Sequence, residues 1–303
     1  MGFSNFIQIA VKDSGANMDD QVKNASSGQA TVSAEIVPEG SEIFHAAAER
    51  GYRRLNRRRI DMGVSGFIAG MNVTFGALAA AAVTGAVQAS IGDQFALFAE
   101  VMGAIVFPIG FILVIIGRSE LFTENFLVPT ASVLAHKSKF RSLATLWSLT
   151  LLGNLLGAFV VAKMMSLEHY HGVPAVETIT HIHHMAEFLV LERDWDASFI
   201  SGIFAGWLIT LMTLLLLTTD NIMAKIAVIW CVGFLIILNK FNHIVVNSAE
   251  IFMAIFTGND TITYWAWFKN SFAPTLLGNI IGGLVFVTLL EYVKVIRLPE
   301  KWR

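Results

Sequence analysis

Two short motifs each occur twice in this chain, and both copies lie in long apolar stretches. The sequence SGFIAG at 65–70 recurs as SGIFAG at 201–206, and GNLLGA at 153–158 recurs as GNIIGG at 278–283. An internal repeat within a membrane protein is typical of transporters and channels, whose pathway runs between the two halves. The repeat therefore predicts two structurally equivalent halves with a pathway between them.

Long uncharged stretches define the class of the protein. They cover residues 63–90, 101–117, 197–219 and 271–290, and about 20 consecutive apolar residues are enough to cross the hydrocarbon core of a bilayer. Only 15% of the residues are charged, whereas a soluble domain carries about a quarter. The sequence therefore predicts an all-α membrane protein. We expect no cofactor and no enzymatic activity, because the spans lack a cysteine–histidine pair, paired carboxylates or a phosphate-binding loop.

The hydrophobic pattern predicts six spans, which lie near residues 63–88, 94–135, 142–165, 198–218, 222–256 and 269–293. The loop at 135–141 and the C-terminal end are basic, whereas the connection at 166–197 is mostly acidic. Because basic loops remain on the cytoplasmic side of a membrane, we expect both termini in the cytoplasm and the protein in a bacterial inner membrane.

The same patterns divide the chain into four parts. The expected parts are a disordered cytoplasmic tail at 1–40, a basic amphipathic helix at 41–61, a six-span channel domain at 62–295 and a cytoplasmic tail at 296–303. Within the channel domain the two repeats cover about 62–165 and 198–293, with three spans each. Since three is an odd number, the second copy crosses the membrane in the opposite direction, which makes the repeat inverted.

The helix expected at 41–61 ends in a cluster of arginines. Its members are Arg50, Arg53, Arg54, Arg57, Arg58 and Arg59. A basic cluster immediately before a first span is typical of the cytoplasmic flank, where it meets anionic lipid headgroups. We interpret this segment as a helix that lies along the headgroups, in preference to a helix that binds nucleic acid.

Spans two and five are too long for single straight helices, and each contains a polar interruption. The interruptions are GRSELFTEN at 117–125 and NKFNHIVVN at 239–247. Irregular backbone at this depth must be buried in protein or line a cavity, because an unsatisfied backbone group in lipid costs several kcal/mol. Aligning the two segments superposes Arg118 on Lys240, Glu120 on Asn242 and Asn125 on Asn247. We therefore expect helices two and five to be broken at equivalent places.

The interruptions also carry a resemblance to a known family. The motifs are Glu120-Leu121-Phe122-Thr123-x-Asn125, Phe241-x-His243-x-x-x-Asn247 and the paired Gly-Asn-x-x-Gly sequences. They resemble the signatures of the formate/nitrite transporter family, over about 45–295. The resemblance implies a homopentamer with one pore in each protomer and an aquaporin-like fold. It also implies conduction of small monovalent anions such as formate, nitrite or hydrosulfide, with or without a coupled proton.

The resemblance assigns a set of pathway residues. It places His243 at the middle of the pore and Thr123 in the loop that interrupts span two, with Phe122 beside it at a constriction. Apolar residues narrow the pathway on either side of the two interruptions. The full expected set is His243, Thr123, Phe122, Leu121, Asn247, Phe107, Phe111, Ile236, Asn242, Glu120, Arg118 and Lys240.

The chain departs from the family pattern in several places. Asn242 precedes the histidine where the family usually has glutamate, and neither 180–184 nor 193–196 supplies the lysine usually found before span four. Arg118 and Lys240 are additional cations. Each is expected either to attract substrate or to be ion-paired, Arg118 with Glu120 or Glu124 and Lys240 with a neighbouring carboxylate.

An anion that enters a narrow apolar pore loses its hydration, so its charge must be compensated. Helix ends at the interruptions direct N–H groups inward, and the additional cations would contribute a positive potential. We expect His243 to be neutral at pH 7 and to donate either a hydrogen bond or a proton.

Five of the eight histidines lie in the connection at 166–197: His169, His171, His181, His183 and His184. A metal site is conceivable there, but we expect a solvated loop whose charge changes between pH 5 and 7.

Two other function classes stay open at this point. The first is an aquaporin-like pore for small neutral solutes, which is disfavoured because no Asn-Pro-Ala motif occurs and cations stand at both interruptions. The second is a membrane enzyme or a non-transporting accessory protein.

Overall fold

The computed structural model describes residues 40–169 and 175–296. The expected N-terminal tail (up to residue 39), His171 and the end of the chain (297–303) lie outside the described residues. All regular elements in the described ranges are helical, and η4, η5 and η6 are π-helical. In chain order they are α3 (Gly40–Leu55), α4 (Arg59–Ile91), η2 (Asp93–Phe95), α5 (Ala96–Val106), α6 (Pro108–Ile116), η3 (Phe122–Asn125), α7 (Val128–Leu134), α8 (Phe140–His169), α9 (Val176–Glu187), η4 (Phe188–Glu192), α10 (Trp195–Leu215), α11 (Ile222–Leu238), α12 (Ile244–Phe256), α13 (Tyr264–Ala266), η5 (Trp267–Phe272), α14 (Ala273–Gly283), η6 (Leu284–Leu289) and α15 (Leu290–Ile296).

The predicted helical membrane class is confirmed. Within the described residues, five helical segments are long and apolar enough to cross a membrane: Arg59–Ile91, Asp93–Ile116, Phe140–His169, Trp195–Leu215 and Tyr264–Ile296. The predicted fifth span corresponds to two shorter apolar helices, α11 and α12. Each of these is too short to cross alone, so the count of six spans stays a prediction.

The repeated motifs form the two most extensive helix contacts. Helix α4 packs along α8, and α10 packs along α14, which are the four helices that carry the two pairs of repeated motifs. A Cβ atom added at Gly70 would overlap the backbone oxygen of Asn154, and one added at Gly206 would overlap that of Asn279. Small residues allow membrane helices to approach this closely. The glycines of the repeat are therefore required by packing.

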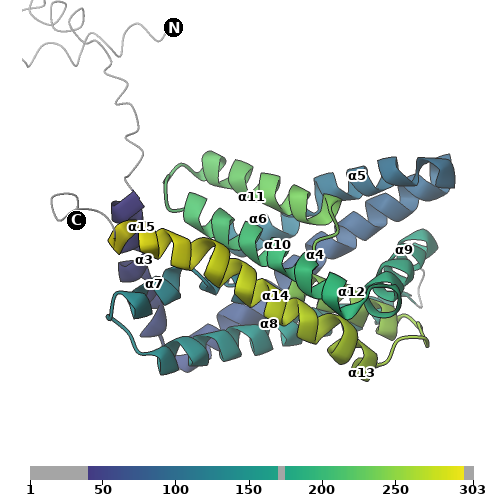
Figure 1. Ribbon diagram of the computed structural model, residues 1–303. Coiled ribbons are helices and arrows are strands. Elements are labelled where there is room, and N and C mark those ends of the chain that lie inside the picture. The colour runs from purple at the N-terminus through teal and green to yellow at the C-terminus, as the bar shows by residue number, and fades with distance from the viewer. Residues whose placement is uncertain (1–39, 170–174, 297–303) are drawn as a thin grey trace, which may run out of the picture. The chain divides into compact units, whose positions relative to one another are not determined.

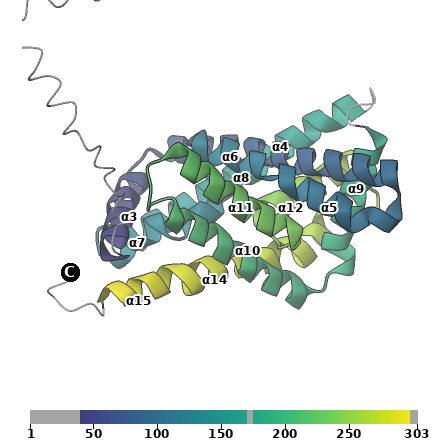
Figure 2. The same ribbon diagram turned by 90° about the horizontal axis from the view of Figure 1, so that it is seen from above.

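Helices α3, α7 and α15 gather at one end of the helical domain, and α9 lies at the other end (Figures 1 and 2). Phe44, Ala47 and Ala48 of α3 are buried together with Val128 and Ala131 of α7. The sequence predicts that this helix lies along lipid headgroups. Its apolar face packs on α7 and α15, and its position along the headgroups stays a prediction.

The histidine-rich connection differs from its prediction. The prediction of a solvated loop is wrong for residues 176–187, because this segment forms helix α9. Ile179, Ile182 and Ala186 are buried, and their spacing of three and four places them on one face of a helix. The described residues contain no group of three His, Cys, Asp or Glu side chains that could hold a metal ion.

The packing of α4 against α8 predicts different effects for two glycines of α4. Gly70→Ala should lower the free energy of unfolding by about 1–3 kcal/mol, because the new methyl group overlaps the backbone of α8. Gly63→Ala is the matched control, since no atom lies within 4 Å of a Cβ at that position. Thermal unfolding of both variants in detergent measures the difference. Equal melting temperatures would contradict the close contact.

Candidate functional site

Both predicted interruptions begin with the same backbone turn. Arg118 follows α6 with φ 59°, and Lys240 follows α11 with φ 51°. In each turn the N–H of this residue donates to the carbonyl three residues earlier, and the next N–H donates to the carbonyl five residues before it. These are the two hydrogen bonds of a Schellman motif, which ends a helix and usually has glycine at the left-handed position. A long basic side chain occupies this position in both halves, where a positive charge is favourable at the negative end of a helix.

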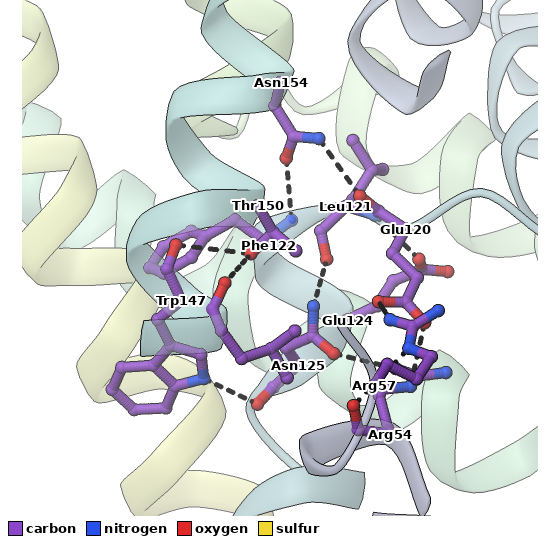
Figure 3. Close-up of polar contacts among 11 residues, drawn as sticks. Arg54, Arg57, Glu120, Leu121, Phe122, Glu124, Asn125, Trp147, Thr150 and Asn154 are labelled. Carbon is purple, nitrogen blue, oxygen red and sulfur yellow. Dashed lines mark hydrogen bonds and ion pairs between the residues drawn. The ribbon is translucent and has the colours of Figure 1, made fainter. Parts of the chain in front are cut away.

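The asparagine of GNLLGA holds the first interruption in place (Figure 3). Asn154 Oδ1 accepts a hydrogen bond from the N–H of Phe122 at 2.8 Å. Its Nδ2 donates to the carbonyl oxygens of Gly66 at 2.8 Å and Glu120 at 3.0 Å. One fully buried amide thus satisfies the backbone of the interruption and attaches it to α4.

The asparagine of GNIIGG makes the same three bonds in the second half. Asn279 Oδ1 accepts from the N–H of Ile244 at 3.0 Å, and its Nδ2 donates to the carbonyls of Gly202 and Asn242, both at 2.8 Å. The partners are equivalent residue by residue, because Gly202 aligns with Gly66, Asn242 with Glu120 and Ile244 with Phe122. The two interruptions therefore occupy equivalent environments.

The two halves meet at a polar pair. The Oγ1 atom of Thr123 lies 2.8 Å from Nε2 of His243, and both side chains are fully buried. His243 is also the N-cap of α12, and its Nδ1 accepts the N–H of Val246 at 3.3 Å. A neutral imidazole has one N–H and one acceptor nitrogen. Because Nδ1 accepts the capping bond, the neutral ring carries its proton on Nε2. The Nε2–H group then donates to Thr123 Oγ1.

Aromatic and aliphatic side chains enclose this pair. The ring of Phe111 packs edge-on to His243 with centroids 5.6 Å apart, and Phe107 packs on Phe111 at 5.0 Å. Leu121 and Ile236 are also fully buried. Phe122 packs edge-on against Phe126 and Trp147. The predicted apolar residues, Phe122 included, therefore belong to one buried core around the interruptions.

A vestibule of about 610 Å³ opens on the α3 side of this layer. We call it the arginine vestibule; its charged lining residues are Arg50, Arg54, Arg57, Arg118, Glu120, Glu124, Asp220 and Lys225. Glu120 pairs with Arg54 at 3.0 Å and with Arg57 at 2.6 Å (Figure 3). The carboxylate of Glu124 instead accepts the N–H of Leu121.

Of the two alternatives for Arg118, the ion pair with Glu120 or Glu124 is not found among the described residues. Glu120 pairs with Arg54 of α3 and with Arg57, which follows α3. The carboxylate of Glu124 caps the 3₁₀ turn η3. Arg118 is exposed, and among the described residues it has no ion-pair partner.

A second vestibule, of about 670 Å³, opens on the α9 side. We call it the histidine vestibule; its charged and titratable lining residues are Asp93, Glu100, Glu177, His181, His184 and Lys240. Lys240 Nζ lies 3.0 Å from Glu100 Oε1, so the predicted ion pair of Lys240 exists. Burial lowers the pKa of His181, with Glu100 opposing this effect and Lys240 adding to it. His181 is therefore mostly uncharged at neutral pH.

Arg193 is a site residue that the sequence reasoning missed. Its Nη1 donates to Asn242 Oδ1 at 2.6 Å and to the carbonyl of Lys240 at 2.9 Å. Arg57 makes the equivalent contact with Glu120 in the first half. A signal was present, because Arg57 and Arg193 each lie eight residues before the first serine of their copy of the repeat. Burial lowers the pKa of Arg193, but a guanidinium stays charged.

The symmetric asparagines predict symmetric losses of stability. Asn154→Ala and Asn279→Ala each leave one N–H and two carbonyls of buried backbone without their partner. Each buried group left without a partner costs about 1–3 kcal/mol of folding free energy. Both variants should therefore have a melting temperature well below that of the wild type, and the two decreases should be similar. Asn72→Ala is the control, because it removes one exposed bond to the carbonyl of Leu113. A loss no larger than that of the control would contradict the role of the two amides.

Comparisons with known proteins agree with this architecture. The family model described as "Formate/nitrite transporter" matches residues 41–293. The chain is 31% identical over 256 residues to the uncharacterized transporter YrhG of Bacillus subtilis, covering 83% of this chain and 91% of that protein. It is 32% identical over 241 residues to a probable formate transporter of Methanothermobacter thermautotrophicus, covering 76% and 86%.

Two solved structures share the fold. One is described as an FNT family ion channel, with a TM-score of 0.73 and 23% identity over 84% of this chain and 98% of that chain. The other is described as a pentameric formate channel with formate bound, with a TM-score of 0.68 and 19% identity over 79% and 98%. The chain therefore belongs to the formate/nitrite transporter family, whose named relatives are transporters and channels, not enzymes.

Proposed function

We propose that this protein conducts small monovalent anions of the formate, nitrite and hydrosulfide class across a membrane. The pathway runs from the arginine vestibule past Thr123 and His243 to the histidine vestibule. The observation that carries this proposal is the buried Thr123–His243 pair, which joins the two interruptions between two charged vestibules. The formate named for a relative and for a structural neighbour supports the substrate class.

The hydrogen-bond pattern indicates how the pair would treat an anion. Because the Nε2–H of His243 donates to Thr123 Oγ1, the threonine hydroxyl proton is free to donate to a substrate oxygen. Within the described residues that hydroxyl has no other partner. A protonated His243 would lose the bond from the Val246 N–H and would place a positive charge at a helix N-terminus, which is unfavourable. His243 therefore acts as a neutral group that orients Thr123.

Charge in the arginine vestibule would guide the anion to this pair. The arginine vestibule contains five cationic side chains against three carboxylates. A cleft with an excess of one sign of charge concentrates ions of the opposite sign. On the other side, Arg193 contacts an amide at Asn242, so the guanidinium charge is not neutralised there by a carboxylate.

The assembly and topology follow from the same reasoning. We infer a homopentamer with a pathway in each protomer, as in the pentameric neighbour. We infer six spans in two inverted repeats, with α11 and α12 together forming the fifth, and both termini in the cytoplasm of a bacterial cell. Many large apolar side chains are exposed, among them Leu97, Leu152 and Trp265, as expected for surfaces that meet lipid or a neighbouring protomer.

Flux into liposomes tests the proposed function. Protein reconstituted in liposomes should pass formate and nitrite faster than protein-free liposomes do, with little flux of glycerol or water. The reason is that the proposed path presents cations and hydroxyl donors, which favour anions. Glycerol or water flux without anion flux would identify a pore for neutral solutes, and no flux of any kind would exclude a transport function.

A pair of substitutions at Thr123 tests the role of its hydroxyl group. Thr123→Val keeps the shape of the side chain but removes the donor, so we expect formate flux to fall about tenfold, the loss of one hydrogen bond to the substrate. Thr123→Ser restores the donor and should recover most of the flux. If the valine variant conducts as well as the serine variant, the hydroxyl does not contact the anion.

A further inference from the structure

The histidine vestibule has the wrong charge for an anion pathway. Its lining contains the carboxylates of Asp93, Glu100 and Glu177 but one lysine, Lys240, which is already paired with Glu100. An anion approaching from this side meets a net negative field, which should repel it. The arginine vestibule presents the opposite field. This difference between the two ends requires a separate explanation.

A small cavity lies next to the histidine vestibule and is lined in part by α12. It has a volume of about 40 Å³, and its polar lining residues are Thr84, Glu100, His181, Lys240, Asn247 and Glu250. We call it the glutamate cavity. Glu100, His181 and Lys240 line both spaces, so the two are adjacent. A volume of this size holds a few water molecules or a small solute.

Glu250 reaches this cavity from the same helix as His243. His243, Asn247 and Glu250 follow one another at spacings of four and three residues, which places them on one face of α12. The rest of α12 is nearly all apolar, with the sequence IVVNSAEIFMAIF. Each polar residue on such a helix is costly in a membrane protein and therefore points to a function.

The charges around Glu250 favour a proton in this cavity. The groups that face it are Glu100 from α5, His181 from α9 and Lys240 at the end of α11. Lys240 binds Glu100 at 3.0 Å, and no ion pair joins Glu250 to a cation among the described residues. Two carboxylates that share one cation in a small cavity do not both ionise easily. Glu250 is the member without a partner.

The side chain of Asn247 shows where a ligand would bind. It is 5% exposed, and its Oδ1 accepts the backbone N–H of His243 at 3.2 Å. Its Nδ2 is buried without a hydrogen-bond partner, and the residue lines the glutamate cavity. An unpaired buried donor favours a ligand with an acceptor oxygen. A small carboxylate could accept from Asn247 with one oxygen and face Glu250 with the other.

We propose that Glu250 is the residue that protonates a small weak-acid anion before it crosses the apolar layer. The O–H bond of the Glu250 carboxyl group breaks, and a new O–H bond forms on the anion, which becomes the neutral acid. Glu250 is left as a carboxylate and takes a proton back from water in the histidine vestibule. The neutral acid then passes Phe111 and Ile236 without the desolvation cost of a charge. Because both ring nitrogens of His243 are already engaged, the proton comes from Glu250.

This inference rests on the proposed anion transport, and the experiment separates the two. Liposomes containing the full-length protein are given a formate gradient, and formate uptake is measured together with the internal pH from pH 5 to 8. The wild type should carry close to one proton with each formate. Glu250→Gln should lower uptake at least about tenfold at pH 7 and flatten its pH dependence. Glu168→Gln, an exposed glutamate of α8 that lines neither vestibule nor the glutamate cavity, should behave as the wild type.

The outcomes are distinct. If the wild type moves no anion, the proposed function itself is wrong. If the wild type moves formate with protons and Glu250→Gln does the same with an unchanged pH profile, the assignment of Glu250 is overturned. Gel filtration reports whether the Glu250→Gln protein assembles. If it does not, Glu250→Asp is used in its place. In infrared difference spectra, the protonated carboxyl band of the wild type should shift in Glu250→Asp; an unshifted band would also overturn the assignment.

Discussion

Non-helical backbone inside an apolar domain needs a hydrogen-bond partner for every N–H and C=O group, and the rest of this structure depends on how that need is met. Asn154 and Asn279 meet it with one amide in each half. Each amide can reach three backbone groups only because α4 and α8, or α10 and α14, approach closely at glycines. The repeated motifs, the close helix packing and the two interruptions therefore depend on one another.

This arrangement is symmetric, but the chemistry placed on it is not. Leu121 and His243 are equivalent positions in the two interruptions, and so are Thr123 and Val245. The polar pair therefore takes its threonine from one half and its histidine from the other. The flanking contacts differ in the same way, since Arg57 binds a carboxylate at Glu120 and Arg193 binds an amide at Asn242. The repeated backbone positions the side chains, and substitutions between the halves give each side its own electrostatics.

Much of this could be predicted from the sequence, because the repeated motifs are themselves the contacts. SGFIAG and GNLLGA contain the glycines and asparagines that pack α4 on α8, so finding them twice identified equivalent halves. The interruptions were recognisable because polar residues are rare in apolar spans. Thr123 and His243 could be assigned as pathway residues from the family resemblance, and their role in transport stays a prediction.

The remaining features depend on contacts that no local pattern reveals. The left-handed backbone at Arg118 and Lys240 was not predictable, since neither residue type favours it. Glu100 and Lys240 are far apart in sequence, and only the packing of α5 beside α11 brings them together. The arginines of α3 were assigned to lipid because an arginine-rich helix before a first span is typical of that setting. The actual partners of one of them, Arg54, are Glu120 and Asn125, which lie on a distant segment.

Hydrogen–deuterium exchange at the interruptions tests the central claim most directly. The account predicts that the amide protons of Phe122 and Ile244 exchange as slowly as those in the middle of α4 and α10, although neither has a backbone partner. Exchange as fast as in the connection at 257–263 would contradict it, because the two asparagine side chains would then not be holding the interrupted backbone.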